Sequence, residues 1–203
     1  NGTVLDCVFR NNHVGYANSG GAIQWRGDNG KILKSQFYQN DAWCGAAVCW
    51  VGDNGFISES TVMDNGFFDW GIYWFGKNGT IVHSILVGNG YPLVLRSSEK
   101  LTADYNFWGD TIYNIPKVEK PDFVSKWLVL NYNHDGKFLL KGDNITISYD
   151  LSYLADKAGN ISRYSDAYGL YDGEINYTAE KTGYLDITFD NGIKIKIDAR
   201  EAI

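Results

Sequence analysis

The chain is poor in proline, cysteine, methionine and histidine, and these shortages narrow what it can be. Its 203 residues include three prolines, three cysteines, one methionine and three histidines. The odd cysteine count and spacing match neither a disulfide framework nor a zinc site. No apolar run approaches the roughly 18 residues of a membrane-spanning helix. The net charge of −6 argues against a surface that binds nucleic-acid phosphates.

Glycine, tyrosine and tryptophan are plentiful instead, with 23, 14 and 7 residues. Together with many Asn-Gly and Asp-Gly pairs, they favour strands joined by tight turns. The first half of the chain repeats one unit. The glycines that close its Asn-Gly turns are Gly2, Gly30, Gly55 and Gly79, so the steps are 28, 25 and 24 residues. A period of this length without a helical pattern is typical of a solenoid.

Each Asn-Gly turn is followed by the same short sequence pattern. Its first position is β-branched, its fourth is small, its sixth is large and apolar, and an asparagine stands three residues further on. The four copies are Val4, Cys7, Phe9 and Asn12; Ile32, Ser35, Phe37 and Asn40; Ile57, Ser60, Val62 and Asn65; and Ile81, Ser84, Leu86 and Asn89. The first position is out of phase with the fourth and sixth, so a bend or bulge must separate them. The asparagines are expected to form a ladder of amide hydrogen bonds at a corner.

A further strand in each unit carries apolar residues on one face, which we expect to point inward. The pairs are Ile23 and Trp25, Val48 and Trp50, Ile72 and Trp74, and Leu93 and Leu95. The residues between them are expected to point outward: Gln24, Cys49, Tyr73 and Val94. Stacking at this period predicts a right-handed parallel β-helix of about four rungs, with a tryptophan ladder inside. A β-propeller is the structural alternative, but its blades need a longer repeat.

The repeat decays near residue 97, and Asp104–Gly109 is interpreted as a cap in which Phe107 and Trp108 cover the open core end. Pro116 and Pro121 flank a charged segment that marks a boundary. We therefore expect an N-terminally truncated β-helix domain over residues 1–115 and a second domain over 120–203. Five strands are expected in the second domain: Trp127–Tyr132, Asn144–Tyr153, Glu174–Ala179, Tyr184–Phe189 and Ile193–Ala199. Their spacing predicts an immunoglobulin-like antiparallel β-sandwich, for which about seven strands are usual.

Three sequence motifs in the chain resemble those of a known family. They are Gly20-Gly21-Ala22-Ile23, the rung Asn-Gly-x-Ile-x-x-Ser-x-Phe, and the end motif Asp104-Tyr105-Asn106-Phe107-Trp108-Gly109. In these the chain resembles the adhesin-like cell-surface proteins of methanogenic archaea, which usually carry two tryptophans in the end motif and an immunoglobulin-like module after it. The resemblance implies an extracellular, cell-surface location and a binding or structural role, without a known ligand.

Parallel β-helices also include polysaccharide lyases and hydrolases, which need clustered carboxylates with a base. The position after each turn strand reads Asp6, Lys34, Glu59 and His83, and a Lys34–Glu59 pair is more simply a solvated ion pair. We therefore predict a non-enzymatic protein with no catalytic residue, metal or cofactor. Calcium held by turn aspartates stays an open alternative; these are Asp28, Asp53 and Asp110.

Outward apolar residues of the third rung form the predicted partner-binding or glycan-binding patch. They are Trp70, Tyr73 and Phe75, with Phe67 and Phe68 nearby in sequence and Val51 beside them. Such a patch marks contact with a cell-surface glycan or protein unless a loop or the second domain covers it. A subunit of an extracellular filament is the alternative function. A β-helix lyase or hydrolase, tested through Glu59, is the second alternative.

Five Asn-x-Ser/Thr sequences are candidate N-glycosylation sites: Asn1, Asn78, Asn144, Asn160 and Asn176. Each is a weak signal alone, because such sequences arise by chance in a chain rich in asparagine. Asn78 at a solenoid turn and Asn160 in an expected loop are the strongest of the five. The three thiols of Cys7, Cys44 and Cys49 are expected to be small buried or half-buried side chains, and a Cys44–Cys49 bridge is the open alternative.

Overall fold

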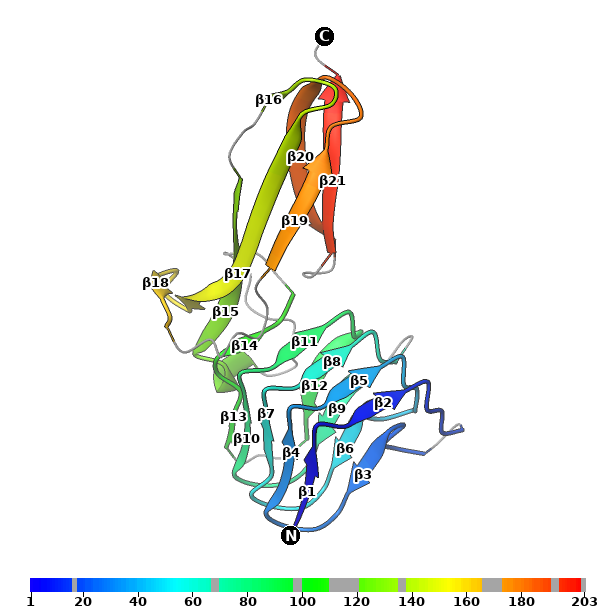
Figure 1. Cartoon of the computed structure of the whole chain (residues 1–203). Coiled ribbons are helices and arrows are strands. Elements are labelled where there is room, and N and C mark those ends of the chain that lie inside the picture. Colours follow the sequence, from blue (N-terminus) through cyan, green and yellow to red (C-terminus); the bar gives the residue numbers. More distant parts are fainter. Residues whose placement is uncertain are drawn as a thin grey trace.

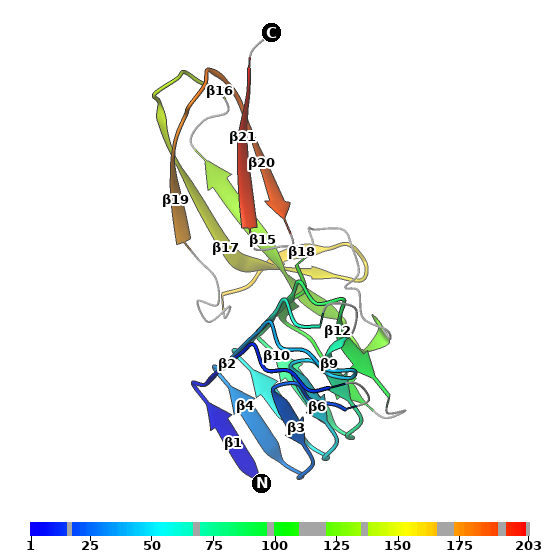
Figure 2. The ribbon, with the colours of Figure 1, turned by 90° about the vertical axis from the view of Figure 1, so that its right-hand side faces the viewer.

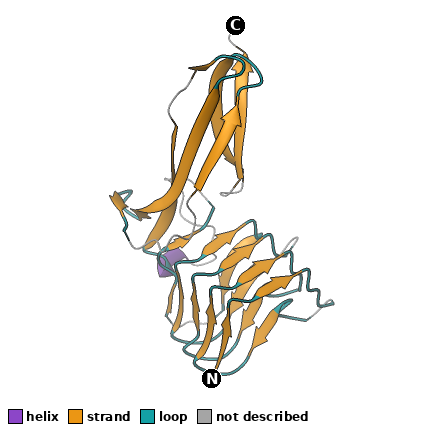
Figure 3. Cartoon of the chain, in the orientation of Figure 1, coloured by secondary structure: helices purple, strands orange, loops and turns teal. Residues whose placement is uncertain are grey.

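In the computed structural model (Figures 1 and 3) the regular secondary structure is almost entirely β-strand, joined by loops. The structure describes residues 1–15, 18–66, 70–96, 100–109, 121–134, 138–165, 173–190 and 194–201. Within those ranges the only helical segment is the short 3-10 helix η1 (Pro121–Phe123). The all-β class predicted from the composition is therefore confirmed.

The first half is a parallel β-solenoid of about four turns, whose three sides are sheets of parallel strands (Figure 2). Sheet 1 contains β1 (Gly2–Leu5), β4 (Gly30–Leu33), β7 (Phe56–Ser58), β10 (Gly79–Val82) and β13 (Leu101–Thr102). Sheet 2 begins with β2 (Val8–Arg10), β5 (Gln36–Tyr38), β8 (Thr61–Met63), β11 (Ile85–Val87) and β14 (Asn106–Phe107). Sheet 3 contains β3 (Ile23–Trp25), β6 (Val48–Trp50), β9 (Trp70–Trp74) and β12 (Tyr91–Leu95).

The bend expected between sheets 1 and 2 is a single residue in the left-handed conformation. At Asp6, Lys34, Glu59 and His83 the φ angle is 50, 50, 51 and 50°. A second left-handed residue precedes each ladder asparagine: Asn11, Gln39, Asp64 and Gly88. Each non-glycine residue of this kind costs roughly 1–2 kcal/mol. The same strain therefore recurs in every coil, and the stacked contacts described below must offset it.

Tryptophans pack over the glycines of the Asn-Gly turns. The positive φ of these turns belongs to the asparagines, such as Asn54 at 55°, and the glycines are needed for space instead. A Cβ on Gly55 would lie 2.3 Å from Cε2 of Trp50, and one on Gly30 would lie 2.2 Å from Cε2 of Trp25. The indole rings stack on one another as well: the Trp25–Trp50 centroids are 4.9 Å apart and the Trp50–Trp74 centroids 4.8 Å apart.

Gly55→Ala is expected to lower the free energy of unfolding by about 1–3 kcal/mol, because the added methyl group must displace a buried indole. Chemical denaturation measures this difference. Gly15→Ala is the matched control, since nothing lies within 4 Å of the Cβ that it would gain. Equal losses in the two variants would contradict the packing role of Gly55.

Sheet 2 does not stop at the end of the solenoid. β14 pairs in parallel with β15 (Lys126–His134), and β15 pairs antiparallel with the long strand β17 (Asn144–Asp156). Strands β18 (Ile161–Arg163) and β19 (Gly173–Thr178) pair with β17. A separate sheet contains β16 (Phe138–Leu139), β20 (Gly183–Asp190) and β21 (Lys194–Glu201). Figure 1 shows β15–β21, here called the blade, extending from the solenoid.

Two hydrophobic clusters hold the blade together and to the solenoid. Leu139, Ile145, Ile147, Ala179 and Leu185 form a cluster contributed by both blade sheets. At the base, Leu151 and Leu154 of β17 pack with outward side chains of the solenoid strands, including Ile85, Val87 and Phe107. The five strands expected in this half are all present in shifted or extended form, and the structure adds β16 and β18.

The expected cap at Asp104–Gly109 is only partly correct. Phe107 pairs in register with Ile85, so strand alternation places both side chains on the outer face, and Phe107 does not cover the core. Trp108 does join the core. The stack continues into residues 123–129, because Ala103 N donates to Phe123 O (3.1 Å) and Trp127 enters the core. The expected domain boundary lies outside the described residues.

Candidate binding surfaces

The patch predicted on the outside of sheet 3 is largely buried. Cys49 and Tyr73 are 1% and 8% exposed, and with Val94 they form a cluster against which Cys44 and Trp70 pack. The expectation that Tyr73 presents its side chain to a partner is therefore wrong, and the side chain of Cys49, which points outward beside it, is buried as well. Side chains of the same sheet cover them: the rings of Trp70 and Tyr73 stack with centroids 4.8 Å apart.

Arg96 completes the cover over this cluster. Its Nε donates to Oη of Tyr73 at 2.9 Å, and its guanidinium lies 5.4 Å from the ring centroid of Trp70. These contacts combine a hydrogen bond with cation–π attraction. Of the predicted patch, Phe75 and Val51 remain exposed, at 43% and 42%. Phe67 and Phe68 lie outside the described residues.

The environment of Cys49 favours the protonated form of its thiol. Burial raises its pKa above the ordinary value and the neighbouring Cys44 adds to the rise, while a hydrogen bond with Ser19 and the charge of Arg26 lower it only in part. A raised pKa keeps the thiol protonated at neutral pH, and the thiolate is the reactive form. Cys49 is therefore protonated at neutral pH, and it packs with Tyr73 and Val94 in the buried cluster.

The bend residues on which the enzyme alternative depends make contacts of different kinds. Lys34 Nζ lies 3.8 Å from Glu59 Oε2, with both side chains substantially exposed, which fits the predicted ion pair. His83 Nε2 lies 2.7 Å from Oη of Tyr164, and its ring stacks with Tyr105, so His83 joins the solenoid to the blade. Among the residues that the structure describes, no group of three His, Cys, Asp or Glu gathers to hold a metal.

The turn aspartates accept hydrogen bonds from the next coil. Asp28 Oδ1 accepts from Asp53 N at 2.8 Å, and Asp53 Oδ1 accepts from Lys77 N at 2.9 Å. These bonds join neighbouring coils, whereas the turn interpretation expected bonds to backbone within the same turn. Asp110, the third aspartate considered for calcium, lies outside the described residues.

The asparagine ladder expected from the sequence is present. Asn12 Nδ2 donates to Asn40 Oδ1 at 2.8 Å, Asn40 Nδ2 to Asn65 Oδ1 at 2.8 Å, and Asn65 Nδ2 to Asn89 Oδ1 at 3.2 Å. The same amides also donate to backbone carbonyls of the coil before, such as Asn65 Nδ2 to Phe37 O at 3.0 Å. A parallel serine ladder runs beside it, in which Ser35 N donates to Ser60 Oγ at 3.1 Å. Both ladders satisfy buried polar groups at corners.

All five candidate glycosylation asparagines are exposed. Two of them, Asn144 and Asn176, lie on neighbouring paired strands, and each stands opposite the threonine of the other's Asn-x-Thr sequence: Asn144 pairs with Thr178, and Asn176 pairs with Thr146. Thr178 Oγ1 donates to Asn144 Oδ1 at 2.7 Å, and Thr146 Oγ1 to Asn176 Oδ1 at 2.8 Å. Asn78 stands at a solenoid turn and Asn160 near a bend after β17, as expected. Their modification stays a prediction.

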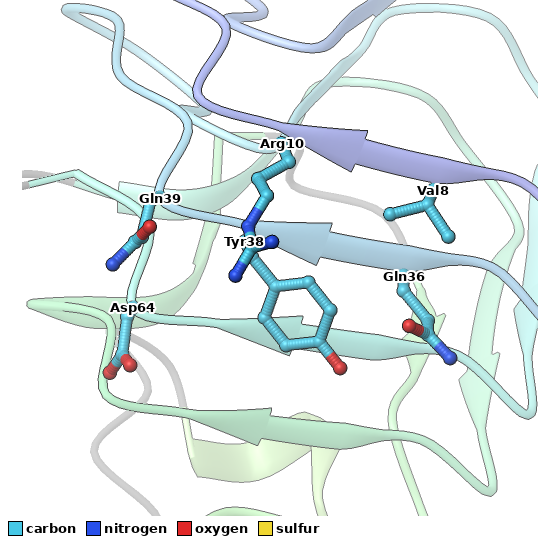
Figure 4. A pocket seen from close by; sticks show the side chains of 6 residues that line it. All are labelled: Val8, Arg10, Gln36, Tyr38, Gln39 and Asp64. Atoms are coloured by element: carbon cyan, nitrogen blue, oxygen red, sulfur yellow. The ribbon is translucent and has the colours of Figure 1, made fainter.

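Sequence reasoning missed a groove on the outside of sheet 2. Figure 4 shows its lining side chains, which come from the first three coils: Val8, Arg10, Gln36, Tyr38, Gln39 and Asp64. The cavity has a volume of about 390 Å³. A second cavity of about 580 Å³ lies next to it and shares Gln39 and Asp64 with it. The signal lay in the outward positions of β2 and β5, of which Arg10, Gln36 and Tyr38 are polar or aromatic where the outward residues of β11, Ile85 and Val87, are apolar.

These features define a parallel β-solenoid protein with an antiparallel β-blade added to one of its sheets. Comparison of the chain with models of protein families, with curated proteins and with solved structures finds no match. Within its described ranges, the chain contains no helix with the length and apolarity needed to span a membrane.

Proposed function

We propose that this chain is a non-enzymatic, extracellular part of an adhesin-like or structural cell-surface protein. The solenoid serves as a stiff arm with binding surfaces on its sides, and the blade is a spacer related to immunoglobulin-like modules. In this proposal the coil is right-handed. Two blade sheets that pack through Leu139, Ile147 and Leu185 support the immunoglobulin-like relationship. The sequence resemblance to archaeal adhesin-like proteins supports the surface location.

The observation that carries the proposal is the continuity of sheet 2. Its hydrogen-bonded order runs from β2 through β5, β8, β11 and β14 to β15 and β17, so no flexible joint separates solenoid from blade along this path. Two parts connected only by a linker would move independently. A shared sheet holds them in one orientation, which is what an arm that presents a surface at a distance needs.

Side-chain contacts reinforce this junction. Leu128 of β15 is fully buried beside Leu154 and Phe107, and Tyr164 of the blade bonds to His83 of the solenoid. The burial of such apolar side chains contributes about 1.5–3 kcal/mol each. The junction is therefore a packed core rather than a surface contact.

A bend in β15 and β17 turns the sheet into the blade. The pairing register shifts between Val129 and Asn131, and Asp150 on the opposite strand accepts bonds from Ser152 N (2.8 Å) and Asn131 Nδ2 (3.3 Å). Burial alone would raise the pKa of Asp150, but hydrogen bonds from the hydroxyl and the N–H of Ser152 and from Asn131 hold it below its ordinary value. The carboxylate is therefore charged at neutral pH and bonds to groups of both strands beside the bend.

Small-angle X-ray scattering is expected to show one rigid, extended particle. Leu154→Asp, which puts a charge into the junction where Leu154 is 6% exposed, should give a flexible particle with a broader distance distribution. Leu140→Asp is the matched control, because Leu140 is 56% exposed on the blade and should leave the scattering unchanged. A wild-type chain that already scatters as two independent bodies would contradict the arm.

The non-enzymatic part of the proposal has its own test. Incubation of the wild-type chain with plant and cell-wall polysaccharides should release no reducing ends and no unsaturated products. Turnover that is lost on Glu59→Gln would overturn the proposal in favour of a lyase or hydrolase.

A further inference from the structure

The outer face of sheet 2 has two different compositions. In the later coils its outward side chains are apolar and buried beneath the blade: Ile85, Val87 and Phe107, all at most 3% exposed. In the first two coils the same face is uncovered, with Val8 at 64% exposed and with Arg10 and Gln36 also exposed. The change from apolar to polar therefore follows the edge of the blade.

The uncovered part of this face is the groove of Figure 4, and its polar groups are unengaged. Within the described residues, the side chains of Arg10, Gln36, Tyr38, Gln39 and Asp64 make no hydrogen bond or ion pair. Elsewhere on the solenoid, polar side chains at equivalent corners are committed to ladders, as with Asn40 and Asn65. Five free polar groups around one hollow offer both donors and acceptors to a ligand.

The groove holds these groups in a fixed frame. Tyr38 is half-buried, so its ring has a supported position, and its neighbours in register are Arg10 on β2 and Met63 on β8. Asp64 stands at a left-handed corner, and its Oδ1 occupies the space that a Cβ of Gly88 would need. Because β5 and β8 are paired on both sides, an incoming peptide cannot add to them as a strand. Recognition over β5 and β8 must therefore use side chains.

We infer that this groove binds a neutral oligosaccharide, with Tyr38 as the platform for a sugar face and Gln36, Gln39 and Asp64 bonded to hydroxyl groups. An aromatic ring with a polar tip, flanked by amides and a carboxylate, matches a ligand that is apolar on its faces and dense in hydroxyls at its rim. The charges of Arg10 and Asp64 balance, and the chain as a whole carries −6, so a polyanion is disfavoured. The inference rests on the proposed surface-binding function and names its ligand class and site.

The test is a screen of the wild-type chain on an array of neutral and acidic oligosaccharides, followed by calorimetry on the tightest neutral ligand. Tyr38→Ala is expected to weaken binding roughly tenfold. Gln36→Ala, which changes an exposed residue that leaves the fold intact, should weaken it several-fold. Tyr91→Ala is the matched control, since Tyr91 is an exposed tyrosine on sheet 3, and Phe75→Ala tests the patch expected there. Both should bind as the wild type does.

Three outcomes would overturn the inference: no neutral oligosaccharide bound by the wild type, unchanged binding in Tyr38→Ala and Gln36→Ala, or a loss confined to Phe75→Ala. Binding of acidic sugars alone, weakened by salt, would also contradict it. These results are distinct from failure of the proposed function. A chain that adheres to cell surfaces but binds no oligosaccharide loses only the groove, whereas cleavage of a bound sugar would overturn the non-enzymatic function.

Discussion

Trp50→Ala is expected to lower the free energy of unfolding by about 3–5 kcal/mol. Trp50 is fully buried, and its indole is the middle member of a stack with Trp25 and Trp74. Its removal leaves a cavity in the narrow interior of a coil and exposes one ring face on each neighbour. Chemical denaturation of the whole chain measures the loss, and a difference of this size should also appear as a lower unfolding temperature.

Two further variants show whether the loss comes from the ring or from its N–H group. Trp50 Nε1 has no hydrogen-bond partner in the described part of the chain, whereas Trp74 Nε1 donates to Gly76 O at 2.9 Å. Trp50→Phe is therefore expected to cost less than Trp74→Phe, because only the latter breaks a buried hydrogen bond. The reverse order would show that the indole of Trp50 is bonded in solution.

Asn65→Ala is expected to lower the free energy of unfolding by at least about 3 kcal/mol, since it orphans several buried groups at once. Asn65 is 0% exposed. Its Oδ1 accepts from Asn40 N at 3.0 Å and from Asn40 Nδ2 at 2.8 Å, and its Nδ2 donates to Phe37 O and Met63 O. The alanine supplies none of these bonds, and water has no room to replace them without opening the corner.

Asn12→Ala is the control for ladder position. Asn12 is exposed, and its side chain makes a single amide bond, to Asn40 Oδ1. We expect a loss of about 0.5–1.5 kcal/mol, the net contribution of one hydrogen bond. Equal losses at positions 12 and 65 would show that stability comes from asparagine itself rather than from its place in a two-sided ladder. Denaturation midpoints of the two variants in the same buffer decide between these.

The solenoid could be predicted because each coil repeats the same residue types at corresponding positions. Asn12, Asn40, Asn65 and Asn89 recur at corresponding places, and stacking is the arrangement that satisfies all of them. The inward tryptophans followed from the same repetition. The buried state of Tyr73 did not follow, because its cover comes from Trp70 and from Arg96 one coil further on. Alternation along a strand predicts the side of a sheet, whereas burial depends on its neighbours.

The sequence contains weaker signals for the junction between solenoid and blade and for the groove. The pairing of Asn106 with Trp127 joins strands across a break in the repeat, and the two strands share no repeated sequence motif. Phe107 is large and apolar, as a cap residue would be, but its register with Ile85 places it outside. The groove depends on which outward positions the blade leaves uncovered. That edge exists only once β17 and Tyr164 lie against the solenoid, so composition alone could not show it.

The direction of the strands changes between solenoid and blade, and this gives the molecule two different responses to tension. Solenoid strands lie across the stacking direction, so the backbone hydrogen bonds between coils point along it. Blade strands such as β17, β20 and β21 run lengthwise away from the solenoid (Figure 1). A pull between the far end of the blade and the first coil loads the blade bonds together in shear. The same pull acts along the hydrogen bonds between coils, so these bonds break in sequence rather than together. The solenoid is therefore expected to open first, one coil at a time, at a force set by its asparagine and serine ladders.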